Sequence, residues 1–240
     1  MSSNDVRTRP ADHGAIRLEL TGGGALASSL VVSVNEFCDQ VEDAVSGGDR
    51  PLGVVLISPG TGPEPEEVGI RLVNRWERVL RRVERLGAVT IAVVERDCAG
   101  PAVELLLATD YRLGAANANL ALPVGTGQFW PGMVLHRLAN QLGVSRTRQL
   151  LLRSPELPAA RAAELGLLDE ITEDLAGSLA AAVESFRTVD GPEFAVRRRL
   201  LLDAPTTTFE DALGVHLAAC DRSLRRAAKD VADSAAMATL

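Results

Sequence analysis

One glutamate, Glu104, stands in a setting that suits proton transfer. Its neighbours Val103, Leu105 and Leu106 are apolar. It lies one turn into a helix that Gly100-Pro101-Ala102 is expected to begin, because proline suits the first helical position. An apolar setting shifts the pKa of a carboxyl group toward the range that general acid–base catalysis uses. The helix dipole alone would also favour a carboxylate there, so this structural interpretation stays open beside the catalytic one that we favour.

Cys98 and His136 are the other candidates for covalent chemistry. Cys98 follows an expected strand and could form a nucleophile–base pair with His136. A free cysteine is more commonly a small buried core residue, which is the interpretation we favour. The three cysteines, Cys38, Cys98 and Cys220, are far apart in the sequence, and no acidic ligand spacing accompanies His136 or His216. We therefore expect no metal site.

Composition excludes several classes of partner. The chain has 240 residues, a formal net charge of −7 and a sequence pI near 5.1. Proteins that bind nucleic acid usually carry a basic face, so no nucleic-acid partner is expected. No apolar run approaches the roughly 20 residues that span a bilayer, and the N-terminal residues lack the pattern of a signal peptide. The expected location is the cytoplasm, without a membrane partner.

Hydrophobic patterning predicts the elements that must position Glu104. Two continuous apolar runs, 52–57 and 89–94, are typical of parallel strands buried on both faces. Between them, Trp76, Val79 and Leu80 recur at helical spacing. Alternating strands and helices followed by an all-helical tail predict an irregular start, an α/β core and a helical C-terminal extension. These three segments cover residues 1–14, 15–174 and 175–240.

Residues 90–171 also carry short motifs in a fixed order. They are Glu104-Leu105, Ala108-Thr109-Asp110-Tyr111-Arg112, Ala121-Leu122-Pro123, Trp130-Pro131-Gly132, Arg137-Leu138 and a segment from Ala159 to Glu170. In this order the chain resembles the crotonase (enoyl-CoA hydratase/isomerase) superfamily. The resemblance implies a ClpP/crotonase ββα spiral core and an acyl-CoA thioester as substrate, with no cofactor. It also implies a homo-oligomer, a trimer or hexamer, assembled through the helical region 175–240.

Four segments carry a finer resemblance. They are Trp76-Glu77-Arg78, Asp97-Cys98-Ala99-Gly100, Trp130-Pro131-Gly132-Met133 and a segment from Thr206 to Gly214. They are similar to the DpgB-type enoyl-CoA hydratase-like proteins of 3,5-dihydroxyphenylglycine biosynthesis in glycopeptide-antibiotic pathways. This implies a type III polyketide synthase as partner, which condenses malonyl-CoA units. The hydratase-like proteins assist dehydration and aromatisation of the product to 3,5-dihydroxyphenylacetyl-CoA.

The resemblance also implies an oxyanion hole, in which two backbone N–H groups hold the thioester oxygen while an enolate forms. One donor follows an early strand and corresponds to Gly60 or Thr61. The second is the middle residue of a turn at a helix N-terminus and corresponds to Pro101, which has no N–H. Ala102 could supply the N–H in a shifted register.

The family's hydratases use two catalytic glutamates, and the resemblance implies that this sequence retains one of them. Glu104 matches the first, whereas Val124 stands where the second is expected. Trp130 and Gly132, together with Val124, are expected to line the acyl pocket. One carboxylate can still remove a proton and return it elsewhere. The first hypothesis is therefore a hydratase/dehydratase-like lyase with Glu104 as base, and the second is a catalytically reduced homologue that activates or scaffolds the synthase.

Overall fold

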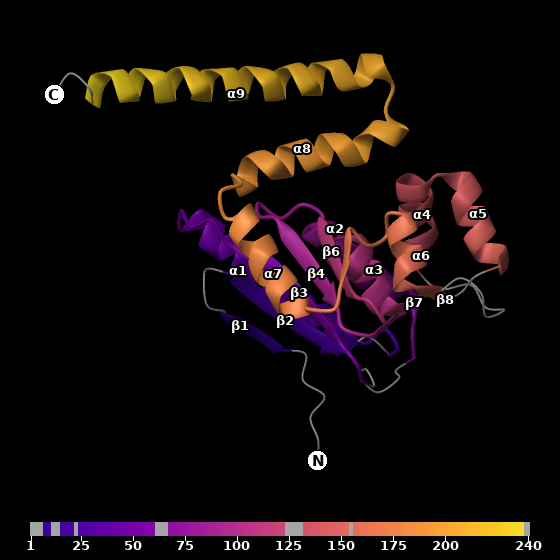
Figure 1. Ribbon diagram of the computed structural model, residues 1–240. Helices are drawn as coiled ribbons and strands as arrows, with labels where there is room; N and C mark the ends of the chain where they lie inside the picture. The colour runs from indigo at the N-terminus through magenta and orange to yellow at the C-terminus, as the bar shows by residue number, and fades with distance from the viewer. Residues whose placement is uncertain are drawn as a thin grey trace. The chain divides into compact units, whose positions relative to one another are not determined.

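The computed structural model describes residues 7–10, 15–21, 24–60, 67–122, 132–153 and 156–237 (Figure 1). The chain forms two compact units, residues 1–195 and 196–240. Over these described ranges, none of the helices combines the length and the apolar character needed to cross a membrane.

A six-stranded sheet with the order β1-β2-β3-β4-β6-β9 organises the first unit. Its strands are β1 (Arg7–Pro10), β2 (Ala15–Thr21), β3 (Leu52–Ser58), β4 (Thr90–Val94), β6 (Tyr111–Ala115) and β9 (Glu170–Thr172). β1 pairs antiparallel with β2, and every other neighbouring pair in this sheet is parallel. The carboxyl ends of β2, β3, β4 and β6 therefore lie along one edge of the sheet.

A smaller three-stranded sheet follows β4 in the chain. It consists of β5 (Asp97–Ala99), β7 (Asn119–Ala121) and β8 (Glu156–Pro158), in the order β5-β7-β8. β5 pairs parallel with β7, and β7 pairs antiparallel with β8. This sheet places the start of the next helix, α3 (Pro101–Leu107), directly after a paired strand.

The remaining helices cover the strands or form the C-terminal part of the chain. They are α1 (Ser28–Ser46), α2 (Ile70–Val83), α4 (Val134–Leu142), α5 (Val144–Arg153), α6 (Ala159–Glu164), α7 (Leu175–Phe186), α8 (Gly191–Asp203) and α9 (Phe209–Met237). A short 3-10 turn, Ala204–Thr206, lies between α8 and α9.

Both faces of the large sheet are buried, because successive side chains of a strand point to opposite faces. On one face, Val55 and Ala92 belong to the main core with residues of α1, α2 and α3. On the other face, Val54 and Val93 pack with residues of α7. Strands covered on both sides need apolar residues at every position. The predicted α/β architecture with parallel strands is therefore confirmed.

Gly53 in β3 lets α1 approach the sheet closely. A Cβ atom at this position would lie 2.8 Å from Cζ of Phe37. Phe37 is fully buried, so its ring cannot move away from such a contact without disturbing the core.

The structure differs from the expected segment boundaries in two places. Residues 7–10 form β1, although 1–14 was expected to be irregular, because an edge strand needs pairing partners rather than an apolar pattern of its own. The other residues of 1–14 lie outside the described ranges. α7 packs on the sheet and the first unit extends to Ala195, so the helical region from 175 does not begin a separate body.

Candidate active site around Glu104

Gly100 and Pro101 fix the start of α3. Gly100 has φ 53° and ψ −128°, a left-handed conformation that glycine adopts without steric cost. Pro101 occupies the first turn, where its missing N–H costs the helix nothing. The Val103 N–H donates to the carbonyl of Gly100 at 3.2 Å. All seven residues of α3 are buried, so this turn sets the position of a helix enclosed by protein.

The other end of α3 is held by side chains from β6 and α4. Nη2 of Arg112 donates to the carbonyls of Leu107 and Thr109, at 3.0 and 3.2 Å. The amide nitrogen of Gln141 donates to the Leu107 carbonyl at 2.9 Å, and its oxygen accepts from Arg112 at 3.0 Å. Burial lowers the pKa of Arg112 from its ordinary value. These bonds satisfy carbonyls that a helix end leaves without intrahelical donors, and they keep α3 in place.

Glu104 lies inside the protein and contacts α2. The side chains of Glu104 and Trp76 are both 0% exposed. Nε1 of Trp76 donates a hydrogen bond of 2.8 Å to Oε2 of Glu104. Its burial agrees with the apolar neighbours in the sequence, whereas this bond between residues 28 apart was not predicted. The sequence did contain a signal, because a buried indole N–H needs an acceptor.

A buried charge network ties α2 to α4 next to this contact. Nη1 of Arg137 pairs with Glu77 at 2.8 Å, and its Nε pairs with Glu84 at 2.9 Å. Oε1 of Glu77 also accepts from the backbone N–H of Met133 at 2.7 Å. Burial alone would lower the pKa of Arg137, but the charges of Glu84 and Glu77 outweigh it, and the pKa is raised. No local pattern in the sequence predicts this network.

The two expected sources of oxyanion-hole donors, Gly60 and the start of α3, follow strands that end at the same edge of the large sheet. Gly60 is exposed two residues after β3. The Glu95 N–H donates to the Ile57 carbonyl at 3.0 Å, which keeps the chain leaving β4 beside the end of β3. β5 and α3 follow directly, so the start of α3, with Pro101 and Ala102, is reached from this edge. Pro101 brings no N–H, and Ala102 is the next backbone donor along the helix.

The remaining candidate residues fall largely outside the described ranges. Thr61, Val124 and Trp130 lie there. Gly132 is described and half-buried, two residues before α4. The structure therefore places Glu104, Pro101 and Ala102 in one buried helix, and it leaves the composition of the acyl pocket as an expectation.

The alternative Cys/His pair is not formed. Cys98 is fully buried in β5, and burial raises the pKa of its thiol well above the ordinary range. His136 is exposed on α4, where a ring nitrogen lies 3.1 Å from Nδ2 of Asn140. A neutral, enclosed thiol is unsuited to nucleophilic attack. In the part of the chain that the structure describes, no three His, Cys, Asp or Glu side chains could together hold a metal ion.

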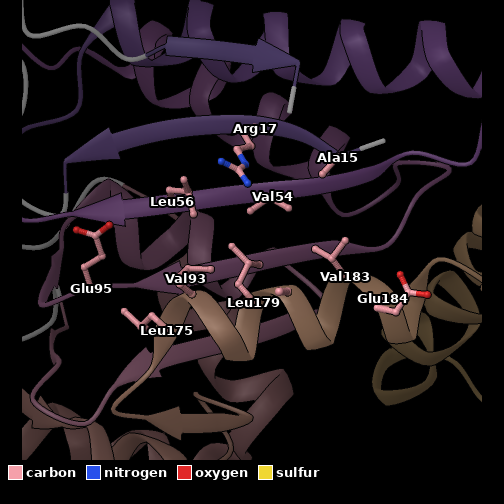
Figure 2. A pocket seen from close by; sticks show the side chains of 12 residues that line it. Ala15, Arg17, Val54, Leu56, Val93, Glu95, Leu175, Leu179, Val183 and Glu184 are labelled. Atoms are coloured by element: carbon pink, nitrogen blue, oxygen red, sulfur yellow. The ribbon is translucent and has the colours of Figure 1, made fainter. Parts of the chain in front are cut away.

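A cavity of about 560 Å³ lies on the opposite face of the sheet, between β2–β4 and α7 (Figure 2). Leu56, Val93 and Leu179 contribute to its apolar walls, and Glu95 and Glu184 lie near its opposite ends. Leu56 and Val93 point away from the face that packs on α3. This cavity is therefore separate from Glu104.

Comparison with known proteins identifies the family. Residues 71–196 match the model of the enoyl-CoA hydratase/isomerase family. The chain is 42% identical over 220 residues to an enoyl-CoA hydratase of Amycolatopsis orientalis, covering 90% of this chain and 99% of that relative. It is 25% identical over 190 residues to a (3,5-dihydroxyphenyl)acetyl-CoA 1,2-dioxygenase of the same organism, covering 78% of this chain and 42% of that relative.

Solved structures show the same fold. An enoyl-CoA hydratase from Bacillus anthracis aligns with a TM-score of 0.74 and 17% identity, over 91% of this chain and 90% of that one. An enoyl-CoA hydratase/isomerase from Cupriavidus metallidurans aligns with a TM-score of 0.73 and 16% identity, over 93% and 90%. The expected crotonase-like α/β fold is confirmed, and the chain belongs to the enoyl-CoA hydratase/isomerase family.

Proposed function

We propose that this protein acts on a polyketide CoA thioester and assists its dehydration and aromatisation to 3,5-dihydroxyphenylacetyl-CoA, alongside a type III polyketide synthase. The observation that carries the proposal is the buried carboxylate of Glu104, held by Trp76 in a chain of the enoyl-CoA hydratase/isomerase family. The choice of acyl group is supported by the relative that acts on (3,5-dihydroxyphenyl)acetyl-CoA, which comes from the same organism as the 42% identical hydratase.

The proposed reaction needs one proton-transfer group. Glu104 removes a proton from the carbon next to the thioester carbonyl, and the bond between the β-carbon and its hydroxyl oxygen breaks. Glu104 then returns the proton to the departing hydroxide, so that one molecule of water leaves and a carbon–carbon double bond forms. Because the same carboxylate takes and gives the proton, no second acid is required.

Backbone N–H groups would stabilise the enolate oxygen formed in this step. Gly60 supplies one donor from the edge of the sheet, and Ala102 supplies the other in place of Pro101. Donors fixed by the fold stabilise developing charge without a reorganisation cost during reaction. The closed packing around α3 also keeps water away from the carboxylate, which preserves its basicity toward a carbon acid.

Glu104→Gln tests the catalytic role. The amide keeps the shape of the side chain and can accept from Trp76, but it cannot take up the proton. We expect product formation with the reconstituted synthase to fall about 100-fold or more, measured by chromatography of the thioester products. Far-UV circular dichroism should remain that of the wild-type protein. Glu36→Gln, an exposed change on α1, is the matched control and should leave product formation unchanged.

The second candidate function is a non-enzymatic activator or scaffold of the synthase. Pro101 favours it, because this residue removes one backbone donor that the family's chemistry uses. A scaffold would raise synthase output equally well as wild-type protein or as Glu104→Gln. Equal output from both, together with lower output when the protein is omitted, would replace the catalytic proposal with this one.

A further inference from the structure

We propose that Trp76 is a positioning residue that decides which oxygen of Glu104 carries the transferred proton. The inference rests on the proposed role of Glu104 as base and adds a second residue to that site. Trp76 touches neither substrate nor reacting atoms in this assignment, and it acts through the carboxylate it holds.

The assignment follows from the hydrogen-bonding capacity of the two groups. The indole nitrogen of tryptophan is a donor and never an acceptor. Its 2.8 Å contact with Oε2 of Glu104 therefore requires a lone pair on that oxygen, whether the carboxyl group is ionised or protonated. A protonated carboxyl oxygen is a poorer acceptor than the carbonyl oxygen beside it, so the contact favours transfer of the substrate proton to Oε1 while Oε2 keeps accepting from the indole.

The packing of both helices keeps this contact in place. Trp76 lies on the buried face of α2 between Val73 and Leu80. The next residue, Glu77, accepts hydrogen bonds from the Met133 backbone and from Arg137, so rotation of α2 would break a part-buried ion pair and a bond to the backbone. α3 is held at both ends, as described above. The carboxylate orientation is thus set by two fixed helices.

The indole also biases the protonation equilibrium of Glu104. A donor stabilises the charged carboxylate more than the neutral acid. Removal of the indole N–H therefore raises the pH at which the carboxylate of Glu104 becomes protonated. A reaction that uses the ionised form of Glu104 as base should therefore lose activity at a higher pH when the indole N–H is absent.

Trp76→Phe removes the N–H and retains an aromatic ring. We expect the midpoint of the acidic limb of the product-formation profile to move upward by about one pH unit. Val79→Ala is the packing control, since Val79 is buried on the same helix. It should lower stability without moving that midpoint. A midpoint unchanged in Trp76→Phe would overturn the positioning role, even where Glu104→Gln has confirmed the base.

Nuclear magnetic resonance of ¹⁵N-labelled indoles tests the contact without any activity. The chain has two tryptophans, Trp76 and Trp130, so two indole signals are expected. The Trp76 proton should lie at low field in the wild-type protein and move upfield in Glu104→Gln, because an amide oxygen is the weaker acceptor. If neither indole signal changes between the wild-type protein and Glu104→Gln, the inference is wrong. This readout applies even if Trp76→Phe fails to fold.

Discussion

Three glutamates of this protein, the buried Glu84 and Glu104 and the half-buried Glu77, accept hydrogen bonds from donors of different charge. Glu77 and Glu84 pair with the cationic guanidinium of Arg137. Glu104 is held by the neutral indole of Trp76. A carboxylate beside a buried guanidinium cannot gain a proton without leaving that cation unbalanced. Protonation of Glu104 does not leave its indole donor with an unbalanced charge, which suits the proposed role of Glu104 in proton transfer.

At the residue scale, Val124 stands where the resemblance implies a second carboxylate, which predicts poor hydration of a simple enoyl-CoA. Hydration needs one group to activate water and another to deliver a proton. We expect wild-type turnover of crotonyl-CoA, followed by loss of enoyl absorbance, to be about one hundredth or less of that of a two-glutamate hydratase. Val124→Glu should raise it about tenfold or more.

Val144→Glu is the matched control for this substitution, because Val144 is 72% exposed on α5. Its crotonyl-CoA turnover should equal that of the wild-type protein. Rapid wild-type hydration would mean that another acid takes the place assigned to the second glutamate.

Glu104 and Pro101 could be selected as candidates from the sequence because each has a local signal: an acid among apolar residues and a proline after glycine. The sequence did not reveal the Trp76 contact or the pairing of Glu77 and Glu84 with Arg137. Those contacts depend on how α2 meets α3 and α4, and no local pattern encodes such a crossing. The acyl pocket depends on the same kind of tertiary arrangement.

At the scale of elements, the strands that lie in long apolar runs were predicted from the sequence, whereas three short strands were not. β3 and β4 were predicted because both of their faces are covered. β5, β8 and β9 were not predicted. Each of these three strands has only three residues and is defined by its pairing with a neighbour. Three residues are too few to show a period.

Tyr111 connects β6, β9 and α7, and its environment predicts a pH dependence of stability. Its hydroxyl on β6 donates to Glu170 of β9 at 2.9 Å, and its ring packs edge-on against Phe186 of α7, with 5.1 Å between centroids. Burial, followed by the bond to Glu170, raises the pKa of Tyr111 to about 12. The folded protein therefore holds this proton more tightly than the unfolded chain, where the pKa is about 10.

The resulting stabilisation is complete below pH 10 and is lost as the pH rises from about 10 to 12. Tyr111 is the only tyrosine in the chain, so phenolate absorbance reports it alone. We expect a titration midpoint near 12 in the folded protein and about 10 in denaturant. Tyr111→Phe should abolish the signal. A midpoint near 10 without denaturant would contradict the enclosed environment assigned to this ring.

At the scale of the whole molecule, the long C-terminal helix shows features of an assembly element. The backbone N–H of Asp211 donates to the Thr208 hydroxyl at 3.2 Å, so Thr208 caps the start of this helix. Leu213, Leu217 and Leu224 recur at helical spacing and are exposed along α9. An exposed apolar stripe of this kind suits packing between subunits. We therefore keep the proposal that this region joins copies of the chain in a trimer or hexamer.

Truncation after Ala204 should separate assembly from folding. The first unit ends at Ala195 and contains both sheets, so it should retain its secondary structure without α9. We expect size-exclusion chromatography to report loss of the oligomer and circular dichroism to report a folded protein. An oligomeric mass retained after truncation, or complete unfolding, would show that the region has another role.

A full-length double variant, Leu217→Glu with Leu224→Glu, tests the same stripe without shortening the chain. Charges placed on a buried interface oppose association, so this variant should also lose the oligomer. Arg222→Glu lies off the stripe at an exposed position and should keep it. Loss of the oligomer in the double variant, but not in Arg222→Glu, would show that association depends on the apolar stripe rather than on α9 as a whole.

The complete enclosure of Glu104 has a kinetic consequence. A carboxylate with 0% exposure cannot meet a carbon acid until the groups around it separate. Under the proposed role of Glu104, each turnover contains an opening step before the proton moves, and such steps commonly take microseconds to milliseconds. Where opening is slower than proton transfer, the turnover rate follows the viscosity of the solvent. Deuterium on the substrate's α-carbon then leaves that rate unchanged, although the breaking of that bond remains the chemical event.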